Sequence, residues 1–249
     1  METMNHGTRP QLLGLLAGLF LASGLVLSAF LITRAWMRIA ESQAIVVTGS
    51  ARKDVRADFV IWRGSVTTEA GTLVAAQRAL RADLDRVIAF SQANQITNQL
   101  VSPINIQEVR STEKLPDGTV QQKTVGYRLT QTVEIHSSDV DRIAQLDRDS
   151  SKLVEQGILF TPAPLEFIYT HAGEAKVEML AEATRDARAR AEQIAVQGGR
   201  AIHQLRSAKM GVFQITPIHS IQTSAEGMND TTTLDKTIRA VVTASFSMN

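Results

Sequence analysis

The histidines are the first residues to consider for acid–base or metal chemistry. The chain has five of them, at His6, His136, His171, His203 and His219. No two are four residues apart, and none follows the spacing by which a helix presents two histidines and a carboxylate to zinc. We therefore interpret them as surface or strand-edge residues, and predict no histidine-based metal site.

Nucleophilic catalysis and phosphate binding also lack their usual motifs. Because the chain contains no cysteine, a thiolate nucleophile, a thiolate metal site and a disulfide are all excluded. Its serines occur without a Gly-x-Ser-x-Gly motif, and no glycine-rich loop leads from a strand into a helix. Gly198 and Gly199 instead follow a predicted helix, which indicates a helix end.

One group of carboxylates has a spacing that suggests a cation site. Asp139, Asp141, Asp147 and Asp149 lie close together, but the segment lacks the glycine and the final glutamate of a calcium-binding loop. A solvated helix face explains these residues better. We accordingly predict no metal, no cofactor and no catalytic residue, and we expect the protein not to be an enzyme.

Basic residues do not form a nucleic-acid binding surface in the sequence. The formal net charge is only +1. Along one predicted helix the charges of both signs alternate at Glu182, Arg185, Asp186, Arg188, Arg190 and Glu192. This alternation favours ion pairs within the helix over a phosphate-binding stripe, so we expect no nucleic-acid partner.

Near its N-terminus the sequence contains a long apolar segment. Residues 11–33 contain no charge and are long enough to span the hydrocarbon layer of a membrane. The alternative is a cleaved signal peptide, but its apolar region is usually shorter, and Ser28-Ala29-Phe30 is a poor cleavage region. We predict a tail at 1–10, a retained transmembrane anchor at 11–33 and a linker at 34–43.

The residues that flank the anchor do not determine its orientation. Trp36, between Arg34 and Arg38, suits the headgroup region of a membrane. Arg9 and the N-terminal amine lie at the other end, so the distribution of positive charge does not choose a side.

Residues 44–249 alternate between the period of a strand and the period of a helix. The pattern predicts strands at 44–50, 58–68, 100–109, 125–136, 165–169, 203–209, 212–220 and 238–248, and helices at 72–90, 138–154 and 174–197. Turns are expected at 52–54 and 115–118. This order is that of an α+β fold with mostly antiparallel sheets and long amphipathic helices.

Two predicted elements have a distinct buried face. In strand 125–136 the odd positions form the core side, with Gln131 as the polar exception. In helix 174–197 the expected buried stripe is Val177, Leu180, Ala181, Thr184, Ala187, Ala191 and Ile194. We expect this helix and the final strand to be the elements through which copies of the chain associate.

Three segments resemble one known family. They are Val125-Gly126-Tyr127-Arg128 running through Thr132-Val133-Glu134-Ile135 to Asp139-Val140-Asp141-Arg142-Ile143, the helical run Asp186 to Ala195, and the opening Ile45 to Ala51. Their order and spacing resemble the SIMPL-domain proteins over residues 44–249. The resemblance implies a periplasmic or secreted bacterial domain without established enzymatic activity, linked to oxidative-stress tolerance and to self-assembly, and it places the domain outside the cytoplasm.

Together these observations predict a non-enzymatic protein of the bacterial inner membrane, with one membrane span and a periplasmic C-terminal domain. It would act through self-association as a homo-oligomer, or by binding other envelope proteins, in oxidative or envelope stress tolerance. Two alternatives stay open. One is a periplasmic module that binds a small molecule or lipid, and the other is an enzyme with an unrecognised site.

Overall fold

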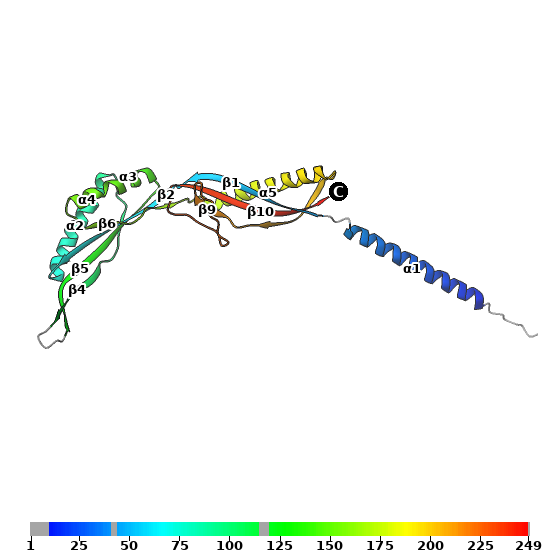
Figure 1. Cartoon of the computed structure of the whole chain (residues 1–249), viewed down its shortest axis with the longest axis horizontal. Coiled ribbons are helices and arrows are strands. Elements are labelled where there is room, and N and C mark those ends of the chain that lie inside the picture. The colour runs from blue at the N-terminus through cyan, green and yellow to red at the C-terminus, as the bar shows by residue number, and fades with distance from the viewer. Residues whose placement is uncertain (1–9, 41–43, 115–119, 249) are drawn as a thin grey trace, which may run out of the picture. The chain divides into compact units, whose positions relative to one another are not determined.

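The computed structural model describes residues 10–40, 44–114 and 120–248 (Figure 1). Helix α1 (Pro10–Ala40) contains the apolar stretch Gly14–Met37, which is long and apolar enough to cross a membrane. A signal sequence near the N-terminus can meet the same criterion of length and hydropathy. The predicted turn at 115–118 lies outside the described residues.

The chain divides into two compact units. Unit 1 comprises residues 1–49, 184–209 and 242–249, and unit 2 comprises residues 50–183 and 210–241. The elements that follow α1 are β1 (Ala44–Arg56), β2 (Phe59–Ala70), α2 (Leu73–Ala93), β3 (Gln99–Val101), β4 (Asn105–Lys114), β5 (Val120–Ser137), α3 (Val140–Asp149), α4 (Ser151–Glu155), β6 (Phe160–Pro162), β7 (Glu166–Ile168), α5 (Ala172–Gln197), β8 (Ile202–Met210), β9 (Gln214–Pro217) and β10 (Asp235–Met248). The predicted α+β class is confirmed.

A six-stranded sheet forms the larger part of unit 2. Its order is β3-β5-β2-β6, with β4 also on β5 and β7 also on β2, and these pairs are antiparallel. Side chains of β2 and β5 pack with those of α2, α3 and α4 in one hydrophobic core. Within it the Trp62 ring stacks on Phe160, with centroids 5.6 Å apart, and Trp62 Nε1 donates to Asp147 Oδ1 at 2.9 Å. The indole therefore contributes apolar area without leaving its N–H unpaired.

In the four-stranded sheet, β10 lies between β1 and β8 and also pairs with β9. Two clusters of α5 side chains pack on this sheet. In unit 2, Ala175 and Met179 pack with Ile238, and in unit 1, Ala187 and Ala191 pack with Phe246. The alanines allow the helix backbone to approach the strands closely.

The turn predicted at 52–54 is wrong. Strand β1 continues without interruption to Arg56, and the turn to β2 occupies the two residues that follow. Asp54 accepts a hydrogen bond from Thr237 Oγ1 of β10 at 2.6 Å, and Arg52 pairs with Asp54 at 3.2 Å. Pairing with a strand distant in the sequence thus overrides the local turn signal of three polar residues.

The face predicted for helix 174–197 is also largely wrong. The buried residues recur at every fourth position, at Ala175, Met179, Ala183, Ala187, Ala191 and Ala195. Val177 and Ile194 are instead 71% and 55% exposed. Only Ala187 and Ala191 of the buried set were predicted, because the predicted stripe mixed steps of one, three and four residues, whereas the packed face repeats at every fourth residue.

The alternation predicted for strand 125–136 is confirmed in its second half. Leu129, Val133 and Ile135 are buried, whereas Val125 is 50% exposed. Val125 lies at an irregularity in the pairing of β4 with β5, opposite the step from Val109 to Arg110. Beyond this point the paired residues of β4 and β5 are exposed on both faces. Alternating apolar and polar residues there do not indicate a buried face.

A buried ion pair lies at the base of β10. Lys236 is fully buried and its Nζ donates to Asp230 Oδ2 at 2.9 Å and to the Asp230 carbonyl at 2.6 Å. The carboxylate also accepts hydrogen bonds from the backbone N–H and the hydroxyl of both Thr232 and Thr233. Burial alone raises the pKa of Asp230, but the bonds from Thr233, Thr232 and Lys236 outweigh it and hold that pKa well below its ordinary value.

Val133 provides a test of the core assignment. Val133→Asp places an unpaired charge at a fully buried position, so we expect the free energy of unfolding to fall by at least about 3 kcal/mol. Val125→Asp, on the exposed part of the same strand, is the matched control and should change it little. Denaturant unfolding of the detergent-solubilised chain, followed by circular dichroism, measures both. Equal losses would contradict the assigned core face.

Asp230→Ala leaves the Lys236 ammonium buried without its partner, and should cost about 3 to 5 kcal/mol at neutral pH. Because folding lowers the pKa of Asp230, its contribution is complete above the ordinary carboxyl pKa and is lost as the pH falls below that value. The stability difference between wild type and variant should therefore shrink from pH 6 to about pH 2. Asp141→Ala, which removes an exposed carboxylate, is the control. A difference independent of pH would refute this role of Asp230.

Candidate functional site

The four described histidines lie apart from one another in roles that need no ligand. His136 bonds to Glu134 on the face of β5, and His171 lies 3.4 Å from Asp58 and 3.5 Å from Glu174. His203 is exposed on β8, and His219 occupies a turn with φ of +65°. The remaining one, His6, lies outside the described residues.

The four aspartates of the predicted solvated helix face each bond to different residues. Asp139 caps α3 by accepting from the Arg142 N–H at 3.1 Å, and Asp141 pairs with Arg56 at 2.6 Å. Asp147 accepts from the Trp62 indole. Asp149 accepts from Gln145 and Lys152. Over the residues that the structure describes, no cluster of three His, Asp or Glu side chains could hold a metal ion.

The charges along α5 pair within the helix, as their alternation predicted. Arg188 bonds to Glu192 and Arg190 bonds to Asp186, each at 2.9 Å and four residues apart. Both arginines are exposed, so these pairs stabilise the helix only slightly.

An ionic network lies on the face of the six-stranded sheet that is opposite its helices. Arg63 of β2 bonds to Glu134 of β5 at 2.6 Å and also to Glu166 of β7, while Glu134 bonds to His136. The bond from Arg63, and then that from His136, lower the pKa of Glu134. The network therefore joins three strands while the Glu134 carboxylate stays ionised, which suits a structural role better than proton transfer.

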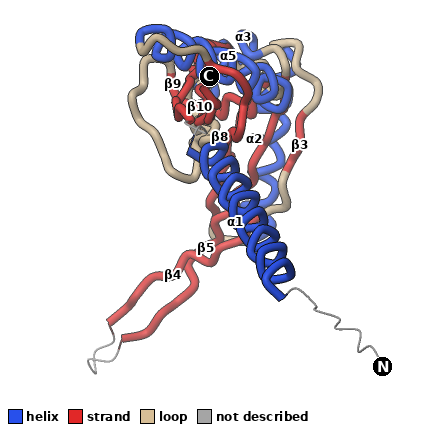
Figure 2. Tube along the Cα trace, turned by 90° about the vertical axis from the view of Figure 1, so that its right-hand side faces the viewer, coloured by secondary structure: helices blue, strands red, loops and turns tan. Residues whose placement is uncertain are grey.

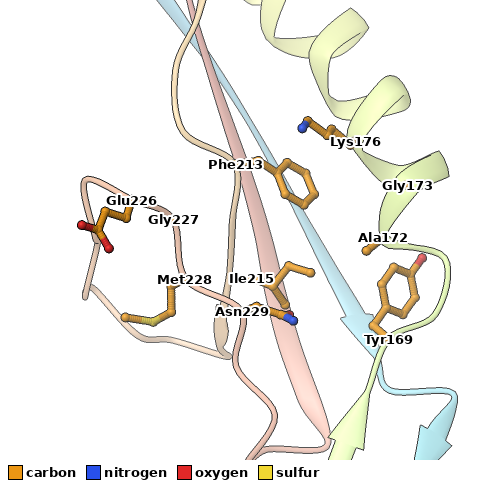
Figure 3. Close-up of a pocket in the computed structure, with 10 residues that line it drawn as sticks. All are labelled: Tyr169, Ala172, Gly173, Lys176, Phe213, Ile215, Glu226, Gly227, Met228 and Asn229. Carbon is orange, nitrogen blue, oxygen red and sulfur yellow. The ribbon is translucent and has the colours of Figure 1, made fainter.

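A pocket of about 460 Å³ lies in unit 2 beside the start of α5 (Figure 3). Its strand side is formed by Phe213 and Ile215, and its helix side by Ala172 and Gly173 with Lys176 above them. The loop Glu226 to Asn229 closes a third side. Its volume lies within the range of small-molecule sites.

Chemically, the pocket combines an apolar floor with the Lys176 ammonium on the helix side and the Glu226 carboxylate on the loop. Phe213 and Ile215 belong to the cluster that packs under α5, while Lys176 makes no hydrogen bond or ion pair with the described residues. Tyr169 lies on the same side as Ala172, and the loop contributes Met228 and Asn229 to the lining (Figure 3). The arrangement could hold an apolar group and an anionic group together, but it contains no nucleophile paired with a base.

Sequence reasoning did not find this pocket. Its residues come from three separated segments, around 169–176, 213–215 and 226–229. None of these segments contains a recognised motif, and only the pairing of β9 with β10 and the packing of α5 bring them together. No signal within a single segment could have predicted it.

Comparison with known proteins gives one family and no characterised relative. No curated protein matches the chain. The family model that matches is SIMPL, described as a protein of unknown function (DUF541), and it covers residues 45–246. Because this match spans most of the chain and runs through both sheets and α5, the chain belongs to the SIMPL family.

Proposed function

We propose that this protein is a non-enzymatic component of the bacterial envelope, held in the inner membrane by α1 with its SIMPL domain in the periplasm, and that it acts by associating with a second copy or with another envelope protein. The apolar stretch Gly14–Met37 supports the anchor. The family resemblance supports the periplasmic side and a role in oxidative or envelope stress tolerance.

The observation that carries the association is an unpaired sheet edge in unit 2. Strands β3 and β4 both pair with β5 and with no second strand among the described elements. Figure 2 shows β4 and the start of β5 as a two-stranded arm. An exposed edge of this length presents N–H and C=O groups to which another strand can bond.

Apolar side chains accompany this edge. Leu100, Val101, Ile104 and Ile106 are 53%, 41%, 37% and 53% exposed. Four exposed aliphatic side chains within seven residues indicate a surface that a partner covers. Pro103, in the middle of the segment, lacks an N–H and limits unspecific strand pairing.

This edge replaces the contact elements expected from the sequence. Strand β10 is paired on both sides, by β1 and by β8, and the alanines of α5 are buried against the chain's own strands. Strand β10 therefore has no unpaired edge, and the alanine face of α5 is already covered. The edge formed by β3 and β4 is therefore the better candidate for association.

If α1 anchors the domain on the outer side of the membrane, protease added to intact spheroplasts should degrade the domain. The physical reason is that a single span leaves everything after residue 40 on one side. Immunoblotting against the C-terminus measures the loss, with a cytoplasmic protein as the control. Protection of the domain until the membrane is ruptured would reverse the topology.

Ile106→Lys should weaken association, because a cation on the edge must lose its water when another strand covers it. We expect the detergent-extracted wild type to be oligomeric or bound to a partner protein. In the variant, the dissociation constant of this complex should rise at least about tenfold, which corresponds to about 1.4 kcal/mol. Val154→Lys, at a position 54% exposed on α4, is the matched control. Wild type that is monomeric and without a bound protein by native mass spectrometry would refute the proposal.

A small-molecule or lipid-binding role is the second candidate, and the pocket under α5 is the observation that favours it. The same native mass measurement should then show a co-purified species that is lost in Lys176→Glu, because the substitution repels an anionic group. Lys152→Glu, on a lysine away from the pocket, is the control. A pocket that stays empty in wild type, while Ile106→Lys still changes the oligomer, would favour association alone.

A further inference from the structure

We propose that the end of unit 1 where β1 begins rests on the membrane surface, in contact with anionic phospholipid headgroups. This end comprises residues 44–47, the last turn of α5 with the loop 198–201, and the first half of β8. The inference rests on the proposed anchor, since it requires α1 to span the membrane.

The chain itself keeps this end close to the membrane. Helix α1 ends at Ala40 and β1 begins at Ala44, so only three residues separate them. A chain advances at most about 3.6 Å per residue, so the start of β1 lies within about 15 Å of Ala40. Ala40 is itself only about 5 Å of helix beyond Met37, where the apolar stretch ends.

Packing places the α5–β8 loop at the same end. Ile45 of β1 and Ile202 of β8 pack on one cluster with Phe246. The Gln204 N–H also donates to Ser247 Oγ at 3.1 Å, near the end of β10. Since Ile202 directly follows the loop, residues 198–201 cannot lie far from the start of β1.

The loop has a defined conformation. The Arg200 N–H donates to the Ala195 carbonyl at 2.8 Å, and the Gly199 N–H donates to the Val196 carbonyl at 3.0 Å. Gly199 has φ of +68°, which a residue without a side chain adopts at little cost. These backbone hydrogen bonds cap the last turn of α5, so this turn and the loop form a rigid surface.

Exposed aliphatic side chains surround this end. Val46 is 65%, Ile194 55%, Val196 63% and Leu205 50% exposed. They come from β1, α5 and β8, and Ile194 and Val196 flank the buried Ala195. These exposed side chains come from three different elements but lie at the same end of unit 1. Contact of that whole end with a membrane surface therefore explains their exposure better than a protein bound to a single element.

The charge of the same segments is entirely positive. Residues 44–47, 193–206 and 244–248 include Arg200 and Arg206 and no acidic residue. The nearest carboxylates on α5, Glu192 and Asp186, are already paired with arginines. A cationic, aliphatic end next to a membrane span matches the headgroup layer of anionic lipids.

The absence of cysteine allows a direct test on the full chain. Gln197→Cys and Val177→Cys each give one labelling site on α5, about 30 Å apart along the helix axis. The labelled chain is placed in nanodiscs of phosphatidylcholine and phosphatidylglycerol with a headgroup-linked nitroxide quencher. We expect fluorescence quenching at least about threefold stronger at position 197 than at position 177, as the helical separation requires.

Charge reversal tests the headgroup chemistry. Arg200→Glu with Arg206→Glu should abolish the excess quenching at position 197, whereas Arg78→Glu with Arg81→Glu on α2 should leave it unchanged. Equal quenching at the two positions, with an intact mass that includes residues 1–40, would overturn this inference and leave the anchor standing. Loss of those residues from the disc-bound chain would overturn the anchor as well. The same excess in discs without phosphatidylglycerol would overturn the assignment to anionic lipid.

Discussion

The arrangement of unit 2 depends on the buried pair of Lys236 and Asp230. A fully buried ammonium is stable only when its charge and hydrogen bonds are satisfied, and here one carboxylate and one carbonyl of the same residue do this. Because the Asp230 carboxylate also accepts hydrogen bonds from Thr232 and Thr233, the loop before β10 has one conformation rather than many. Replacing the pair by apolar residues could conserve stability, but it would remove this directional constraint.

The loop that this pair fixes connects parts of unit 2 that are distant in sequence. The Asp230 N–H donates to the Ile215 carbonyl at 2.9 Å, which holds the loop on β9. The Thr231 carbonyl accepts from Phe167 of β7 at 2.7 Å, and the Leu234 carbonyl accepts from Ala57 between β1 and β2 at 2.8 Å. The same few residues therefore link both sheets within the unit, and they also place Met228 and Asn229 at the pocket.

The surfaces available for function follow from which strands are already paired. Strand β10 has neighbours on both sides and lies against the alanines of α5, so it stabilises the fold and has no free edge. Strand β4 lies beyond the helices that cover the larger core and is paired on one side, so its outer edge is available. Within unit 2, the pocket and the β3–β4 edge are thus formed by different elements, and a ligand and a protein could each use one of them.

The sequence by itself determined the features that depend on the spacing of residues within one helix or strand. The uncharged run at the start, the alternation of Leu129, Val133 and Ile135, and the ion pairs along α5 are each specified by neighbours within one element. Only the tertiary structure decided the continuation of β1 through Asp54, the alanine face of α5 and the burial of Lys236. Each of these depends on a partner far along the chain, and a local pattern contains no information about which distant strand will satisfy a charge or leave room only for a methyl group.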